Sequence, residues 1–202
     1  WIIYYSFIEI GTCDFKSEIQ FASDTTKGVS IEPVKYYLDK LPDKPLVQKL
    51  NCGIGPTAQH SNINFINPEL FSVEKIPKWL RGCSTIGKRH PTALRWFKKN
   101  KSQLDLDDVF IQETVALVPL DIIIQACGIT SVGLLKMDTE GMDADIILNS
   151  MPTIKSIAPE KIVFEINELN ESTKTESAIS KLKGLGYAEV HRGRDIVLRK
   201  AV

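Results

Sequence analysis

Three carboxylates follow an apolar stretch in LLKMDTEGMDADIIL, residues 134–148. The apolar stretch is typical of a buried strand, and Asp138, Glu140 and Asp143 come where that strand gives way to a helix. Carboxylates that lie close together raise one another's pKa, which lets one of them accept a proton near neutral pH. The segment therefore predicts a general base. The alternative is that Asp138 caps the helix and Glu140 stabilises its N-terminus.

Alternating strand and helix patterns surround this segment and must position it. Such alternation implies right-handed crossovers and a mainly parallel sheet, so we predict an α/β, Rossmann-like fold with helices on both faces. A terminal antiparallel hairpin is a common edge for such a sheet. The predicted strands are 2–11, 28–33, 46–51, 131–138 and 161–167, the helices 15–24, 34–42, 119–129, 142–151 and 174–186, and the hairpins 53–67 (or a loop pair) and 187–200.

Ligands of open α/β sheets bind beyond the carboxyl ends of the strands. Functional residues are therefore expected just after the predicted strands, so the carboxylates of DTEG lie at the ligand edge of the sheet and not in the core. These strand ends follow Ile10, Ile31, Leu50, Met137 and Ile166.

Three of these strand ends suit an adenosine. Gly11 permits a tight turn, and Glu32, about twenty residues later, is placed to accept hydrogen bonds from ribose hydroxyls. Asn51 and Cys52 could line an adenine pocket. The alternatives are a solvated first-turn carboxylate for Glu32 and an ordinary turn at Asn51 and Cys52. Because the chain lacks the GxGxxG pattern, S-adenosylmethionine fits better than a dinucleotide.

At these residues the chain resembles the FkbM-type, S-adenosylmethionine-dependent methyltransferases. The segment LLKMDTEGMDADIILN is similar to their lysine-isoleucine-aspartate-x-glutamate-glycine-x-glutamate pattern. FIEIGTCDF resembles their first motif, GVSIEP their ribose motif, KLNCGIG their adenine-side strand and EKIVFEIN their fifth strand. The resemblance runs in order from about Phe7 to Asn167 and implies their Rossmann-like methyltransferase fold.

The resemblance implies S-adenosylmethionine as the cofactor and S-adenosylhomocysteine as its product. Two positions depart from the family, which usually has a glycine in place of Phe15 and a glutamate in place of Asp143. By position, the residues expected around the cofactor are Glu9, Gly11, Thr12, Cys13, Asp14, Glu32, Pro33, Asn51, Cys52 and Asp138.

The resemblance also implies methyl transfer to a hydroxyl group, for which Asp138 is the predicted base. Glu140 would orient the acceptor or hold Lys136, and it could exchange roles with Asp138. His90 is a second candidate for the base, with a surface histidine as the alternative. The residues expected to bind the acceptor are Ser84, Thr85, Glu140, Glu165 and Asn167. No resident metal is predicted; the alternative is a divalent cation bound by Asp138, Glu140 and Glu165, since hard cations favour clustered carboxylates.

A fainter resemblance suggests the acceptor. The run GTCDF…SIEPVKYYLDKLP is similar to glycan-modifying methyltransferase domains of large algal viruses, which are fused behind glycosyltransferase domains. It implies a deoxyhexose hydroxyl, with rhamnose first, on a small-molecule or glycan acceptor. We expect a single domain over 1–202, excised from a longer chain, with an acceptor-covering insertion at about 68–117.

Composition excludes several classes of protein. With 25 basic and 25 acidic residues, the chain has no basic surplus for nucleic acid, and RWFKKNK is interpreted as a solvated helix face. No apolar run reaches the length of a membrane span. Four widely spaced cysteines predict reduced thiols in a cytoplasm, that of the host if the chain is viral.

Two other functions stay open at this point. A nicotinamide-dependent oxidoreductase could use the same fold, although GxGxxG is missing and the tyrosine and lysine of YYLDK lie on the wrong helix. A non-catalytic, nucleotide-binding interaction module would fit the substitution at Phe15. Intact Glu32, Asp138 and Glu140 count against that module.

Overall fold

The computed structural model describes residues 2–15, 17–73, 75–101 and 103–201. Its chain divides into two compact units. The first, which we call the sheet unit, consists of residues 1–59 and 116–202, and the second, the inserted unit, of residues 60–115. Among the described residues, no helix has the length and apolar character needed to span a bilayer.

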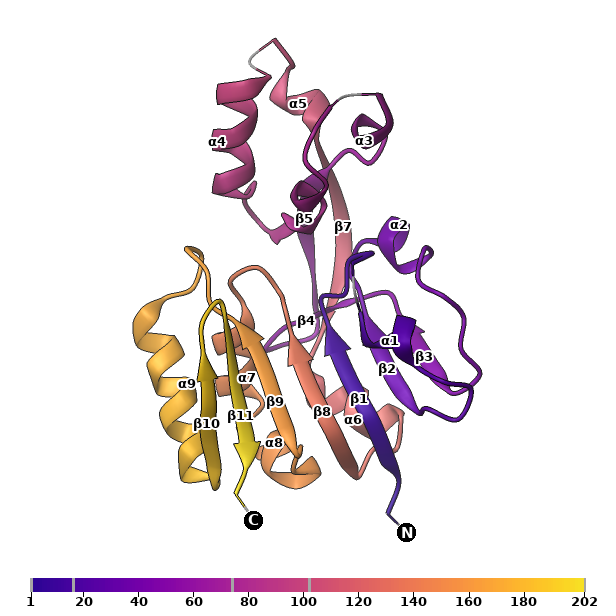
Figure 1. Cartoon of the computed structure of the whole chain (residues 1–202), viewed down its shortest axis with the longest axis vertical. Helices are drawn as coiled ribbons and strands as arrows, with labels where there is room; N and C mark the ends of the chain where they lie inside the picture. The colour runs from indigo at the N-terminus through magenta and orange to yellow at the C-terminus, as the bar shows by residue number, and fades with distance from the viewer. Residues whose placement is uncertain (1, 16, 74, 102, 202) are drawn as a thin grey trace. The chain divides into compact units, whose positions relative to one another are not determined.

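The sheet unit is built on seven strands in the order β10-β11-β9-β8-β1-β2-β3 (Figure 1). The pairs from β9 through β8, β1 and β2 to β3 are parallel, and β11 pairs antiparallel with both β9 and β10. The predicted mainly parallel sheet and its terminal antiparallel hairpin are confirmed. The strands are β1 (Tyr4–Ile10), β2 (Gly28–Ile31), β3 (Val47–Leu50), β8 (Ser131–Met137), β9 (Lys161–Glu165), β10 (Tyr187–Arg192) and β11 (Asp195–Lys200).

Helices cover both faces of this sheet, as predicted, because successive side chains of a strand point to opposite faces. Ile8 and Ile10 belong to a large core shared with α6, α7, α8 and α9, whereas Phe7 packs with residues of α1 and α2. These helices are α1 (Glu18–Phe21), α2 (Lys35–Leu38), α6 (Leu120–Ala126), α7 (Asp143–Asn149), α8 (Met151–Ile157) and α9 (Ser172–Gly184).

The structure corrects several predicted element boundaries. The helices predicted at 15–24 and 34–42 are shorter, spanning only Glu18–Phe21 and Lys35–Leu38. The hairpin expected at 53–67 does not form: β4 (Gly53–Ile54) pairs with the end of β7 (Phe110–Val118), and β5 (Gln59–Ile66) pairs with β6 (Thr85–Ile86). Strand β7 was missed, although its sequence FIQETVALV is rich in β-branched residues. The helix predicted at 142–151 ends at Asn149, and α8 begins anew with a proline in its first turn.

The inserted unit has a core of its own. Within it, β5 lies between β6 and β7, and a cluster containing Leu80, Phe97 and Phe110 is buried. The basic aromatic segment RWFKKNK falls mainly on helix α4, with Phe97 buried and Lys98 and Lys99 exposed, as interpreted from the sequence. The helices of this unit are α3 (Leu70–Val73), a 3₁₀-helix (Lys78–Gly82), α4 (Pro91–Asn100) and α5 (Leu106–Val109).

Candidate active site

The loop after β1 touches the loop after β8 through Gly11. The backbone of Gly11 has φ +78°, and a Cβ there would lie 1.9 Å from the carbonyl oxygen of Asp138. Glycine is therefore required twice, by its left-handed backbone and by the approach of the neighbouring strand. The sequence pattern suggests a ligand as the reason for this glycine, but the closest atom to the missing side chain belongs to the protein itself.

Glu32 joins the loops after β1 and β2. Its carboxylate is buried and accepts hydrogen bonds from the backbone N–H groups of Cys13, at 2.7 Å, and Val34, at 2.9 Å. Burial raises the pKa of Glu32 to about 7, although the backbone donors oppose the shift. The alternative of a solvated carboxylate is therefore wrong.

Asn51 and Cys52 have structural partners in the same region. The Asn51 side-chain amide donates to the backbone oxygens of Glu32, at 3.0 Å, and Pro33, at 2.9 Å, so it holds the loop after β2. Cys52 is buried in the large core. Their contact with adenine stays a prediction.

Thr12, Cys13 and Asp14 form the turn after Gly11. Cys13 has a positive φ of 46°, and its thiol lies 3.5 Å from a carboxylate oxygen of Asp14. Thr12 is buried, and its hydroxyl oxygen has no hydrogen-bond partner among the described residues. A buried hydroxyl without a partner costs free energy unless a ligand or water satisfies it.

Glu9, near the end of β1, links this strand to β8 and to α1. Its buried carboxylate accepts hydrogen bonds from Lys136 Nζ and from the backbone N–H of Glu18, each at 2.8 Å. Burial would lower the pKa of Lys136, but the neighbouring carboxylate of Glu9 raises it overall. The expectation that Glu140 holds Lys136 is wrong, since the Lys136 ammonium group pairs with Glu9 on β1.

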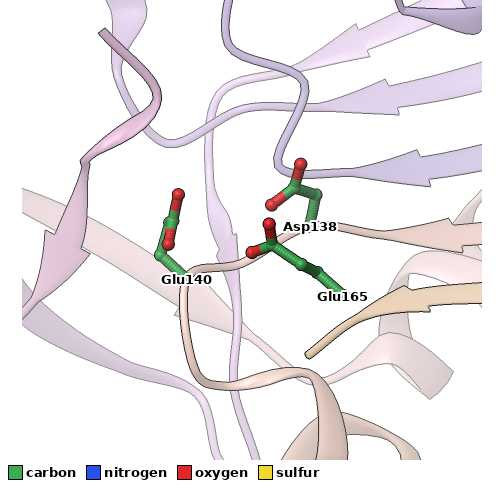
Figure 2. A group of neighbouring side chains, drawn as sticks. All are labelled: Asp138, Glu140 and Glu165. Atoms are coloured by element: carbon green, nitrogen blue, oxygen red, sulfur yellow. The ribbon is translucent and has the colours of Figure 1, made fainter. Parts of the chain in front are cut away.

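Asp138, Glu140 and Glu165 form a carboxylate cluster. One oxygen from each lies within 4.8 Å of the others. Figure 2 shows Asp138 just after β8 and Glu165 at the end of β9, with Glu140 facing them from the loop after β8. Glu140 has a positive φ of 49°, so the loop turns sharply there.

Asn167 and Arg194 bind two members of this carboxylate cluster. The Asn167 amide donates to Glu140 Oε2 and Glu165 Oε2, each at 2.7 Å. Arg194 pairs with the other oxygen of Glu165, Oε1, at 2.5 Å. No hydrogen bond to the Asp138 carboxylate is found among the residues that the structure describes.

These charges act on Asp138. The pKa of Asp138 is raised to about 8. The main cause is its removal from water, and the negative charges of Glu165, Glu140 and Asp143 add to it. The residue as a whole is exposed, so water still reaches it and softens the shift. Asp138 therefore has the properties of a base that accepts a proton near neutral pH.

Asp143 has a structural position at the start of α7. Its side chain is fully buried, and one oxygen accepts a hydrogen bond from the Thr139 hydroxyl at 3.0 Å. Burial raises its pKa to about 6, with the Thr139 hydrogen bond acting in the opposite direction. Asp143 thus braces the loop that carries Asp138 and Glu140.

Carboxylate clusters are also typical of divalent-cation sites. Donors from Asn167 and Arg194 already engage two of the three carboxylates. The expectation of no resident metal stays a prediction.

The remaining predicted residues lie in the inserted unit. His90 is buried, which contradicts the surface position considered as its alternative, and its Nδ1 accepts a hydrogen bond from the Thr92 N–H as the N-cap of α4. The Thr85 hydroxyl donates to the Lys88 carbonyl. The Ser84 hydroxyl is buried without a hydrogen-bond partner in the described residues. Their roles toward the acceptor stay predictions.

Arg194 is a site residue that the sequence pattern did not reveal. Strand β11 runs antiparallel to β9 with Asp195 opposite Glu165, so the turn before β11 reaches the end of β9. The predicted terminal hairpin contained this signal, because a hairpin that returns along β9 must bring its turn to the ligand edge.

Comparison with known proteins identifies the family. The model of the methyltransferase FkbM domain matches residues 9–188, which include the carboxyl ends of β1, β2, β3, β8 and β9. A search among curated proteins finds none with significant similarity. The chain therefore belongs to the FkbM methyltransferase domain family and is a methyltransferase.

Proposed function

We propose that the protein is an S-adenosylmethionine-dependent O-methyltransferase that acts on a hydroxyl group of a sugar. The observation that supports it most is Asp138. This carboxylate stands at the carboxyl end of β8, beside the Gly11 turn, with a pKa raised to about 8 and no hydrogen-bond partner among the described residues. A hydroxyl acceptor needs such a base, whereas an already nucleophilic acceptor would not.

The residues after β1 and β2 fit S-adenosylmethionine. The unpartnered Thr12 hydroxyl is a buried polar atom that a polar ligand could satisfy. The Glu32 carboxylate accepts backbone hydrogen bonds from Cys13, Val34 and Thr12. Because a carboxylate has about four acceptor positions, it can still accept a hydrogen bond from a ribose hydroxyl. The cofactor supplies a methyl group already activated by its sulfonium.

The chain's own residues then hold the acceptor and take up its proton. Asp138 accepts the hydroxyl proton as the oxygen bonds to the methyl carbon and the bond from that carbon to sulfur breaks, which should contribute roughly 10²–10⁴-fold in rate. S-adenosylhomocysteine and the methyl ether are the products. Glu140, Glu165 and Asn167 orient the acceptor.

The polar character of the carboxylate cluster favours a polyhydroxylated acceptor. Carboxylate oxygens accept hydrogen bonds from hydroxyl groups, and three acid side chains meet within one small region. A deoxyhexose such as rhamnose, free or in a glycan, is the acceptor we propose, on the strength of the resemblance in GTCDF…SIEPVKYYLDKLP.

Calorimetric titration with S-adenosylhomocysteine tests the cofactor, with NAD as the parallel control. Micromolar binding of the first ligand and none of the second is expected. Binding of NAD alone would overturn the methyltransferase mechanism proposed for these loops.

Substitution of Asp138 tests the base. Asp138→Asn should retain S-adenosylhomocysteine binding and lose about 10²–10⁴-fold in methyl transfer to a panel of methyl deoxyhexosides, followed by mass spectrometry. Asp145→Asn is the matched control, because Asp145 is a neighbouring aspartate on α7 that pairs with Lys174. Normal turnover by Asp138→Asn would show that another group is the base.

A further inference from the structure

Arg194 reaches the carboxylate cluster from the turn between β10 and β11. Its guanidinium contacts Oε1 of Glu165 through two nitrogens. The Glu165 side chain is only 2% exposed, whereas that of Arg194 is 78% exposed. A buried carboxylate needs a paired charge and hydrogen bonds to offset its loss of water, and Arg194 supplies both.

A hydrogen-bonded path continues from Glu165 to Glu140. The second oxygen of Glu165 accepts from the Asn167 amide, which also donates to Glu140. The Asn167 side-chain oxygen accepts from the backbone N–H of Leu169 at 2.9 Å, so the amide nitrogen must face the carboxylates. Glu165 and Glu140 are thus held by donors, while Asp138 lies outside the path.

Charges from several elements meet at Asp138. Besides its removal from water, Glu165 on β9, Glu140 on the loop after β8 and Asp143 on α7 raise its pKa, while Arg194 lowers it. Lys136, on β8, also interacts with Asp138 but is committed to an ion pair with Glu9. Arg194, whose side chain is largely exposed, therefore offsets part of the negative charge of the cluster.

We propose that Arg194 is a positioning residue for methyl transfer: it holds Glu165 and supplies a positive charge that favours the carboxylate form of Asp138, which is the form that acts as a base. The catalytic meaning of this role rests on the proposed function, since a base is required only for a hydroxyl acceptor. The electrostatic role itself can be measured without any acceptor.

The test is an NMR titration of the Asp138 carboxyl carbon, assigned with Asp138→Asn. Loss of the cation in Arg194→Gln should shift the Asp138 titration midpoint upward, because a nearby positive charge favours the carboxylate. Arg194→Lys keeps the charge and should restore most of the wild-type midpoint. Arg192→Gln is the matched control on the same hairpin, since Arg192 pairs with Glu176 and Glu189 and should leave the midpoint unchanged.

A midpoint in Arg194→Gln that stays at the wild-type value or falls would overturn the proposal. If Arg194→Gln does not fold, the double variant Arg194→Gln, Glu165→Gln, which leaves no buried unpaired carboxylate at position 165, is titrated against Glu165→Gln alone. The midpoint must again be higher without the arginine, and equal midpoints would overturn the proposal.

The two proposals fail separately. If no sugar is methylated but the Asp138 titration midpoint rises in Arg194→Gln, the proposed acceptor is wrong and the electrostatic role of Arg194 is supported. If sugars are methylated and the midpoint does not move, only the role of Arg194 falls.

Discussion

At the scale of single residues, the Glu32 carboxylate has both a structural role and a proposed role in binding the cofactor. Its oxygens tie together the loops after β1 and β2, and burial raises its pKa to about 7. The folded protein therefore binds a proton at Glu32 more tightly than the unfolded chain does. Stability from this group is fully present at low pH and is lost as the pH rises through about 7.

Glu32→Gln should remove this pH dependence. Between about pH 5 and about pH 8, the free energy of unfolding of the variant should improve relative to wild type by about 2.5 kcal/mol, because a neutral amide has no charge to bury. Urea denaturation at the two pH values measures the difference. A difference that is the same at both values would show that Glu32 does not titrate as proposed.

At the scale of elements, the ends of β1 and β8 are fitted to each other at Gly11. The loop after β1 carries residues proposed to bind the cofactor, and the loop after β8 carries Asp138. The close approach of the two loops therefore sets the distance between the cofactor and the proposed base. The chain offers a comparison in Gly186, which also has a positive φ, of 88°. A Cβ there would meet no atom within 4 Å from the described residues other than its neighbours in the chain.

Gly11→Ala should be far more damaging than Gly186→Ala. The control should lose about 1–2 kcal/mol from its left-handed backbone alone. At Gly11 the new Cβ would also collide with the Asp138 carbonyl, so we expect a larger loss of stability and no binding of S-adenosylhomocysteine. Thermal unfolding and calorimetry measure both effects, and equal losses for the two variants would contradict the close fit of the loops.

The elements were mostly predictable because their signals are local. Alternation of apolar strands and amphipathic helices predicted the succession of elements along the chain in the sheet unit, and the rule for strand ends identified Asp138 and Glu32. Strand β7 was missed because the predicted hairpin at 53–67 assumed a partner adjacent in sequence. The end of β7 instead pairs with Gly53 and Ile54, far away in the chain.

At the scale of the whole molecule, the chain contains two units with separate cores. Phe97 is fully buried in the core of the inserted unit, where it meets Phe110 edge-on with ring centroids 6.2 Å apart. Phe164 is buried in the large core of the sheet unit, and every residue proposed to bind the cofactor belongs to that same unit.

Phe97→Ala should therefore destabilise the inserted unit and leave the sheet unit folded. The cavity should cost about 3–5 kcal/mol, and peptides from residues 91–100 should lose protection in hydrogen exchange. Binding of S-adenosylhomocysteine should survive. Phe164→Ala is the matched control and should impair both stability and binding; loss of binding in Phe97→Ala would contradict the independence of the cofactor residues from the core of the inserted unit.

The sequence by itself determined the fold class, the family resemblance and the strand ends at which Gly11, Glu32 and Asp138 lie, because hydrophobic period and turn residues act over short distances. Only the tertiary structure decided the partners. Lys136 pairs with Glu9 because β1 and β8 are neighbours in the sheet, although the two residues are 127 positions apart. Arg194 meets Glu165 because β11 returns along β9. Side-chain charges interact through space, and the register of the strands, which no single segment encodes, sets which of them meet.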